Sequence, residues 1–138
     1  MPQGKQLGSS ILLIVGSLKA TLSMQTYPFE IEYYRTENDR KPFKDWLESL
    51  RDVRGRAKVR VRLDRARLGN LGDRKQVGNG VWEMRIDYGP GYRVYYGMEG
   101  NRLILLLLGG DKGTQQKDID LATGYWRDHQ ERKSQCDT

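Results

Sequence analysis

The chain has 138 residues, the length of a single domain, and its 24 Lys and Arg exceed its 18 Asp and Glu, for a formal net charge of +6. One cysteine excludes an intrachain disulfide. With a single histidine it also argues against a zinc-type His/Cys site, although a site made of carboxylates stays open. We expect no metal and no cofactor. The positive charge favours an acidic or polyanionic partner such as nucleic acid.

The first residues contain a short apolar run, Ile11–Val15, behind Lys5 and ahead of Lys19. The run is far shorter than the roughly 20 apolar residues that span a bilayer, and no small-residue cleavage site of a signal peptide follows it. We therefore expect a cytoplasmic protein whose translation starts at Met24. The expected division of the chain is an upstream or disordered extension over 1–24, a folded domain over 25–127 and a polar tail over 128–138.

A strand is predicted over residues 29–33, where apolar and polar side chains alternate. The helix that follows is expected to be capped by Asn38 or Asp39, with Pro42 in its first turn. Apolar side chains then recur at positions i, i+3, i+4 and i+7, which is the pattern of an amphipathic helix. These side chains are Phe43, Trp46, Leu47 and Leu50.

A second helix is predicted before Gly69, because glycine is a common helix stop. Its apolar stripe consists of Val59, Leu63 and Ala66. Basic residues are spread around this helix, and two interpretations stay open: a solvated face, or a surface that binds RNA phosphates with release of counterions. The residues expected to bind RNA, on this helix and elsewhere, are Arg54, Lys58, Arg62, Arg65, Arg74, Lys75 and Lys117.

Residues 69–80 are rich in glycine and are expected to form a loop. Antiparallel strands follow the loop in quick succession, joined by tight turns. They are predicted over 81–87, 92–97 and 103–108. The last of them is apolar at every position, as is typical of a central strand that is covered on both faces.

The last predicted element is a helix capped by Thr114, with a polar end that frays from Arg127. Its apolar side is formed by Ile119, Ala122 and Trp126. The element order is therefore β-α-α-β-β-β-α. This order predicts an α+β fold in which two N-terminal helices and a C-terminal helix pack on one face of a small twisted antiparallel sheet.

Alternation in the strands predicts an open sheet face on which charged side chains gather, because side chains two positions apart point to the same face. The residues expected to face the helices are Trp82, Met84, Ile86, Val94 and Tyr96. Those expected on the open face are Glu83, Arg85, Arg93 and Tyr95, with Lys112 nearby. Arginine matches phosphate oxygens, and fixed positive charge can stabilise a phosphorane-like transition state without a metal.

Two further groups would complete an RNA-cleaving site: one that takes the 2′-hydroxyl proton and one that protonates the 5′-leaving oxygen. In the alternative interpretation, the same charged residues are cross-strand pairs that stabilise the sheet, and Tyr95 simply covers it. The alternation alone does not decide between these interpretations.

Three segments in this order resemble the strand signature of the RelE/ParE toxins: Val81–Ile86, Gly91–Tyr96 and Leu106–Lys112. The lead-in Gly69–Asp73 and the trailing Lys117–Ile119 are similar to the HigB-like branch, the phage-derived addiction module killer proteins. The resemblance covers most of the predicted domain. It implies a RelE/ParE-like fold and the toxin of a type II toxin–antitoxin module.

RelE-like relatives enter the ribosomal A site and cut mRNA there without a metal, so the resemblance implies an mRNA interferase that inhibits translation. It implies transition-state stabilisation by Arg93, a phosphate contact or proton transfer by Arg85, and general-acid chemistry by Lys112. Glu83 stands where relatives carry lysine, so it either acts as a base or holds Arg85 in place. HigB-like relatives with a histidine in the site have no counterpart in the core here, because the lone His129 is expected to be a surface residue.

Two other functions remain compatible with the sequence. ParE-like relatives share the fold but poison DNA gyrase by binding, without nuclease activity, and a non-enzymatic basic RNA- or ribosome-binding module would also carry this charge. The expected partners are the ribosome, mRNA and a cognate antitoxin. The antitoxin would be a helix-turn-helix DNA-binding protein that covers the basic face with an acidic segment, in a higher-order complex if several copies assemble. No membrane partner is expected.

Overall fold

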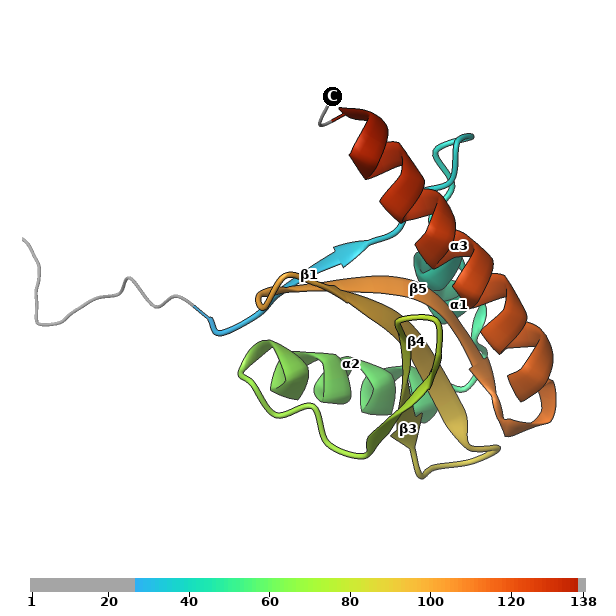
Figure 1. Ribbon diagram of the computed structural model, residues 1–138. Coiled ribbons are helices and arrows are strands. Elements are labelled where there is room, and N and C mark those ends of the chain that lie inside the picture. The colour runs from blue at the N-terminus through green and yellow to red at the C-terminus, as the bar shows by residue number, and fades with distance from the viewer. Residues whose placement is uncertain (1–26, 137–138) are drawn as a thin grey trace, which may run out of the picture.

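Five strands form one mixed sheet in the computed structural model of the protein, which describes residues 27–136 (Figure 1). In sheet order they are β1 (Glu30–Tyr33), β5 (Leu103–Asp111), β4 (Tyr92–Glu99), β3 (Val81–Ile86) and β2 (Arg74–Gly78). The helices are α1 (Pro42–Ser49), α2 (Val53–Arg67), the 3-10 turn η2 (Lys112–Thr114) and α3 (Gln115–Cys136). The predicted α+β class and the packing of helices on a sheet are confirmed.

The sheet differs from the expectation at both of its edges. β1 pairs in parallel with β5, with Glu30 opposite Leu103, so the sheet is mixed rather than antiparallel throughout. β2 forms inside the segment 69–80, which was expected to be a loop, and pairs antiparallel with β3. Gly78, the last residue of β2, and Gly80, in the turn that leads to β3, have φ of 108° and 84°. Glycine therefore marks a hairpin turn here, since it adopts positive φ without strain.

Helices cover both faces of the sheet, so the prediction that they all pack on one face is wrong (Figure 1). The five side chains predicted to face helices, including Met84 and Tyr96, do pack in the core beneath α1 and α2. A second core lies under α3, on the opposite face, and includes Leu105, Leu107 and Trp126. The apolar run of β5 fits this arrangement, because alternate side chains enter the two cores.

Asp52 fixes the start of α2 and joins it to the sheet. Its side chain caps the helix by accepting a hydrogen bond from the Gly55 amide at 2.9 Å, and it accepts another from the Tyr92 hydroxyl at 2.8 Å. By contrast, α1 begins at Pro42 with no side-chain cap, so the predicted cap by Asn38 or Asp39 is wrong. Helix α1 tolerates this because proline at the first position leaves one amide fewer to satisfy.

The C-terminal helix is longer than predicted. It starts at Gln115, after the η2 turn that contains Thr114 and is capped by Asp111, and it continues to Cys136. The expected fraying from Arg127 is therefore wrong. Asp128 holds this part of α3 to β1 by accepting a hydrogen bond of 2.6 Å from the Tyr34 hydroxyl. The proposed extension over 1–24 lies outside the described residues.

None of the helices within residues 27–136 combines the length and the apolar character that crossing a membrane requires.

Candidate active site

Three of the predicted catalytic side chains line one pocket of about 330 Å³. Arg85 and Arg93 lie directly opposite each other in the β3–β4 ladder, so both point to the α3 side of the sheet. Lys112 reaches the pocket from η2, immediately after β5. The remaining lining residues are Asp73, Asp87, Gly89, Pro90 and Gly91. The hairpin register therefore brings together the cations that the sequence grouped.

A buried carboxylate holds the two arginines. The side chain of Glu83 is 0% exposed, and its Oε1 lies 3.1 Å from Nε of Arg85 and 3.9 Å from Nε of Arg93. Its Oε2 accepts hydrogen bonds from the Tyr95 hydroxyl at 3.3 Å and from Nε2 of Gln115 at 2.6 Å. A buried charge is tolerated only when it is paired and hydrogen-bonded in this way. Glu83 thus fixes the two guanidinium groups in relation to each other.

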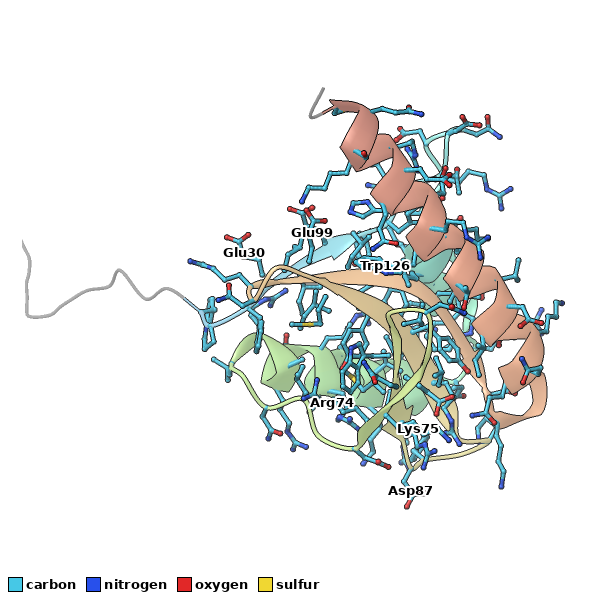
Figure 2. All side chains as sticks on the ribbon, viewed as in Figure 1. Glu30, Arg74, Lys75, Asp87, Glu99 and Trp126 are labelled. Carbon is cyan, nitrogen blue, oxygen red and sulfur yellow. The ribbon has the colours of Figure 1, made fainter. Side chains whose placement is uncertain are left out.

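The expectation that Glu83 and Tyr95 lie on an open face is wrong, because α3 crosses that face. Tyr95 is fully buried, and burial, aided by the negative charge of Glu83, raises the pKa of its hydroxyl far above the usual value. The tyrosine is therefore protonated at neutral pH and donates to Glu83. Gly97 permits the close approach of α3, since a Cβ there would lie 2.3 Å from the ring of Trp126, which Figure 2 shows beneath the helix.

Arg93 is the most constrained cation of the pocket. Its side chain is 12% exposed, and its Nη1 donates to the carbonyls of Gly91 and Tyr92 at 3.1 Å and 3.2 Å. Its Nε is buried and has no hydrogen-bond partner within residues 27–136. Arg85 is 35% exposed and Lys112 is exposed. The pocket therefore presents one rigid cation beside two that an anionic ligand can reach more freely.

Four predicted RNA-binding residues line a second groove of about 430 Å³ between α2 and the end of β3. They are Arg54, Lys58, Arg62 and Arg65. Asp87 lines both this groove and the Arg85–Arg93 pocket, so the two adjoin. The ammonium of Lys58 lies 5.4 Å from the ring centroid of Tyr88, within range of a cation–π contact.

Arg62 differs from the other groove residues. It is half-buried, and its guanidinium donates to the backbone carbonyls of Arg85, Leu71 and Asp73. Burial also lowers the pKa of Arg62 below the usual value for arginine. Because carbonyls occupy its donors, Arg62 anchors α2 to the sheet, and the structure does not favour it as an RNA contact.

The other predicted RNA-binding residues do not join one patch. Arg74 and Lys75 are neighbours on β2 (Figure 2), yet they point to opposite faces of the sheet. The guanidinium of Arg74 lies 4.3 Å from the ring centroid of Trp82, on the α2 side. Lys75 pairs with Glu83 in the register and so lies on the α3 side. Lys117 is exposed in the first turn of α3.

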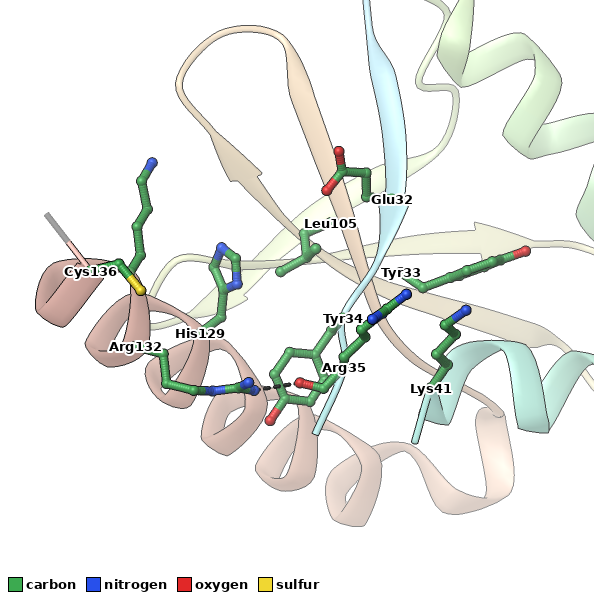
Figure 3. A pocket seen from close by; sticks show the side chains of 10 residues that line it. Glu32, Tyr33, Tyr34, Arg35, Lys41, Leu105, His129, Arg132 and Cys136 are labelled. Carbon is green, nitrogen blue, oxygen red and sulfur yellow. Dashed lines mark hydrogen bonds between the residues drawn. The ribbon is translucent and has the colours of Figure 1, made fainter. Parts of the chain in front are cut away.

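A larger pocket, of about 640 Å³, lies between β1 and the C-terminal half of α3 (Figure 3). Arg35, Arg132 and Lys133 of its lining pair with carboxylates of the same domain. Arg132 pairs with Asp128 at 2.5 Å, donates to the carbonyl of Arg35 and covers the ring of Tyr34. These contacts support the fold, so the size of this pocket does not make it the candidate site.

The only histidine in the chain also lines this larger pocket rather than the arginine pocket. Its Nε2 lies 2.6 Å from Oε1 of Glu99, and its ring stacks on Trp126. His129 is therefore half-buried rather than a free surface residue, and it joins α3 to the end of β4. The paired Glu99 carboxyl has a pKa below its usual range, first because of Lys133 and then because of His129.

Several residues of the site were not predicted from the sequence as site residues. Gln115 reaches the Glu83 carboxylate from α3, and Asp118 is 7% exposed and accepts a hydrogen bond from the Thr114 hydroxyl. Asp73 and Asp87 are exposed carboxylates in the wall of the pocket. Among the described residues, no three His, Cys, Asp or Glu side chains gather as ligands of a metal would.

Comparison with known proteins connects this domain to one family. The model of the family described as "Phage derived protein Gp49-like (DUF891)" matches residues 45–126. An uncharacterized protein of Haemophilus influenzae (strain ATCC 51907 / DSM 11121 / KW20 / Rd) is 49% identical over 80 residues, which cover 58% of this chain and 81% of the relative. The matched region of the family model includes both arginines of the pocket and Lys112.

Proposed function

Because the chain belongs to the family of phage-derived Gp49-like proteins, we propose that it is the toxin of a toxin–antitoxin module and acts as a metal-independent mRNA endonuclease on the ribosome. The family is associated with such addiction modules. The proposal also includes three more specific points: the nuclease activity, a place in the RelE/ParE superfamily and a site of action in the cytoplasm. They come from the resemblance of the strand segments to RelE-like toxins.

One observation carries the nuclease proposal: Arg85 and Arg93 are held side by side by a buried glutamate, with Lys112 in the same pocket. Charge that is already in place when the reaction begins stabilises a transition state more than mobile charge does, because no reorganisation is needed. A surface that only binds RNA has no need of a buried carboxylate to fix the positions of its cations.

The proposed reaction is attack of a 2′-oxygen on the adjacent phosphorus, which breaks the bond to the 5′-oxygen. Arg93 stabilises the negative charge that develops on the phosphoryl oxygens, and Arg85 contacts the same group. Lys112 donates a proton to the departing 5′-oxygen. The 2′-hydroxyl proton passes to an exposed carboxylate of the pocket wall, either Asp73 or Asp87.

Glu83 and Tyr95 act as positioning residues in this proposal. Both are buried, so they do not reach the substrate, and the Glu83 carboxylate is already engaged by four side chains. Of the two roles that the sequence left open for Glu83, the geometry therefore favours holding the arginines over acting as a base.

The test is a cell-free translation reaction in which new mRNA 5′ ends are mapped with and without ribosomes. The wild-type chain is compared with Arg93→Ala and with Arg102→Ala, a matched control whose arginine is exposed and pairs with Glu30 at 3.7 Å, away from the pocket. We expect ribosome-dependent ends inside codons from the wild type and from Arg102→Ala, and none from folded Arg93→Ala.

Two outcomes would contradict this function. Cleavage that persists in Arg93→Ala would remove the arginine pocket as the nuclease site. Intact mRNA in cells that the wild-type chain arrests, together with signs of DNA damage, would instead favour a gyrase-binding toxin without nuclease activity.

A further inference from the structure

Helix α2 exposes a row of apolar side chains on its outer face. Val53 is 66% exposed, Val61 is 45% exposed and Leu68, the residue that ends the helix, is 61% exposed. Ala57 is also exposed and lies between Val53 and Val61 at a spacing of four. Val53, Ala57 and Val61 are four apart and Leu68 follows Val61 by seven, two further turns along the same side of the helix, so we call these four residues the α2 stripe.

The α2 stripe is not part of either core. The inner side of α2 meets the sheet through Val59, Leu63 and Ala66, which are buried. Exposed apolar residues that are scattered singly are normal, whereas several on one side of a helix beside a groove are typical of a docking surface. Ala57 and Val61 form one wall of the groove of about 430 Å³, opposite Ile86 and Tyr88.

The flank of the α2 stripe is basic. Arg54, Lys58 and Arg65 border the groove, and none of them forms an ion pair with a carboxylate in the part of the chain that the structure describes. One carboxylate, that of Asp87, lines the groove beside these cations, so the flank keeps an excess of positive charge that a partner of opposite charge would neutralise. Phosphates of RNA would supply charge alone, and they would leave the apolar stripe exposed to water. A second copy of the chain would bring equally basic residues against it.

We propose that the α2 stripe docks an acidic amphipathic helix of a partner protein. The apolar face of that helix would cover Val53, Ala57, Val61 and Leu68, and its carboxylates would meet the basic flank. This inference deepens the proposed function. It rests on that function only for the biological role of the partner, which would be a neutralising antitoxin. Because Asp87 lines both the groove and the arginine pocket, a docked helix would restrict the path of RNA to the pocket.

The probe is a labelled peptide of about 20 residues, long enough to form a helix in water, with leucine along one face and glutamate on its flanks. A peptide of the same composition in scrambled order controls for charge. Binding to the full chain is measured by fluorescence anisotropy for the wild type, for Val61→Asn/Leu68→Asn and for Leu121→Asn. Leu121 is a matched control, since it is 42% exposed but lies on α3.

We expect the Val61→Asn/Leu68→Asn variant to bind the helical peptide at least about tenfold more weakly, as for loss of a central apolar contact. The Leu121→Asn control and a Val61→Leu variant should bind like the wild type, and the scrambled peptide should bind none of them tightly. A short single-stranded RNA should bind all the variants equally, because their charges are unchanged, and the helical peptide should displace it.

Equal peptide affinity in the wild type and the double variant would overturn the inference. So would sedimentation that shows a wild-type dimer abolished by the double variant, because a second copy would then occupy the stripe. Circular dichroism verifies the fold of each variant. Translation assays on the same proteins distinguish the two proposals. If the peptide binds at the α2 stripe but the protein cleaves no mRNA, the docking inference is supported and the nuclease proposal is contradicted.

Discussion

The domain holds two sets of cations in opposite ways. Arg85 and Arg93 are fixed from below by the fully buried Glu83, whereas Arg54 and Lys58 on α2 extend from an exposed helix face beside apolar side chains. Fixed charge suits a reaction in which one geometry must be stabilised. Exposed charge on flexible side chains suits the positioning of a polyanion or an acidic partner, where several geometries serve equally well.

Removal of the buried carboxylate should break the first arrangement and leave the second intact. Glu83→Ala leaves two arginines near a buried site without their counterion, so we expect a loss of about 3–5 kcal/mol of unfolding free energy. Urea denaturation followed by circular dichroism measures it. Glu83→Gln, which keeps the shape, should lose less. An unfolding free energy of Glu83→Ala within error of the wild type would refute the assigned role.

Loss of the rigid arginine should slow the cleavage step strongly without a comparable loss of RNA binding. We expect Arg93→Ala to lower the single-turnover rate of mRNA cleavage about 10²–10³-fold, as for removal of one preorganised donor. The affinity for ribosomes should change far less, because the α2 cations remain. If a weaker affinity of Arg93→Ala for ribosomes accounted for the whole loss of cleavage rate, Arg93 would be a binding residue instead.

Neutralisation of the exposed set should have the reverse effect. For Arg54→Gln/Lys58→Gln/Arg65→Gln we expect weaker RNA binding and a log K against log salt plot whose slope is shallower by about 2, given three phosphate contacts to a single strand. The cleavage rate of bound RNA should be retained. A matched triple variant, Arg35→Gln/Lys44→Gln/Arg102→Gln, removes cations elsewhere whose side chains are 59%, 45% and 55% exposed, and it should retain the slope.

The smallest effect should come from the carboxylate that anchors α2. The Gly55 amide, and then the Tyr92 hydroxyl, hold the pKa of Asp52 below its usual value of 3.8. Its charge therefore stabilises the fold fully above about pH 4, and this contribution is lost as pH falls through the lowered pKa. Asp52→Asn keeps a helix cap but not the charge. The Tm values of the wild type and Asp52→Asn, measured by thermal unfolding, should converge as pH falls. A difference in Tm that stays constant with pH would contradict this role of the Asp52 charge.

Short-range sequence patterns were enough to predict most of the helices and strands. The alternation around Met84 and Val94 and the unbroken apolar run of β5 identified three strands, and the tight turn after β3 placed Arg85 opposite Arg93. The side chains predicted to face the helices share one face and pack beneath α1 and α2, because period-two alternation is a local property of a strand. The same patterns mistook β2 for a loop, since its strand is short and bounded by turn glycines.

The sequence by itself thus determined the fold class, most of the elements, the relation to phage-derived Gp49-like proteins and the grouping of Arg85, Arg93 and Lys112. Only the tertiary structure decided that α3 packs on the opposite face from α1 and α2 and turns Glu83 from an open-face residue into a buried clamp. The reason is physical. Alternation states which side chains share a face, but the element that covers that face is selected by long-range packing, here of Trp126 over Gly97.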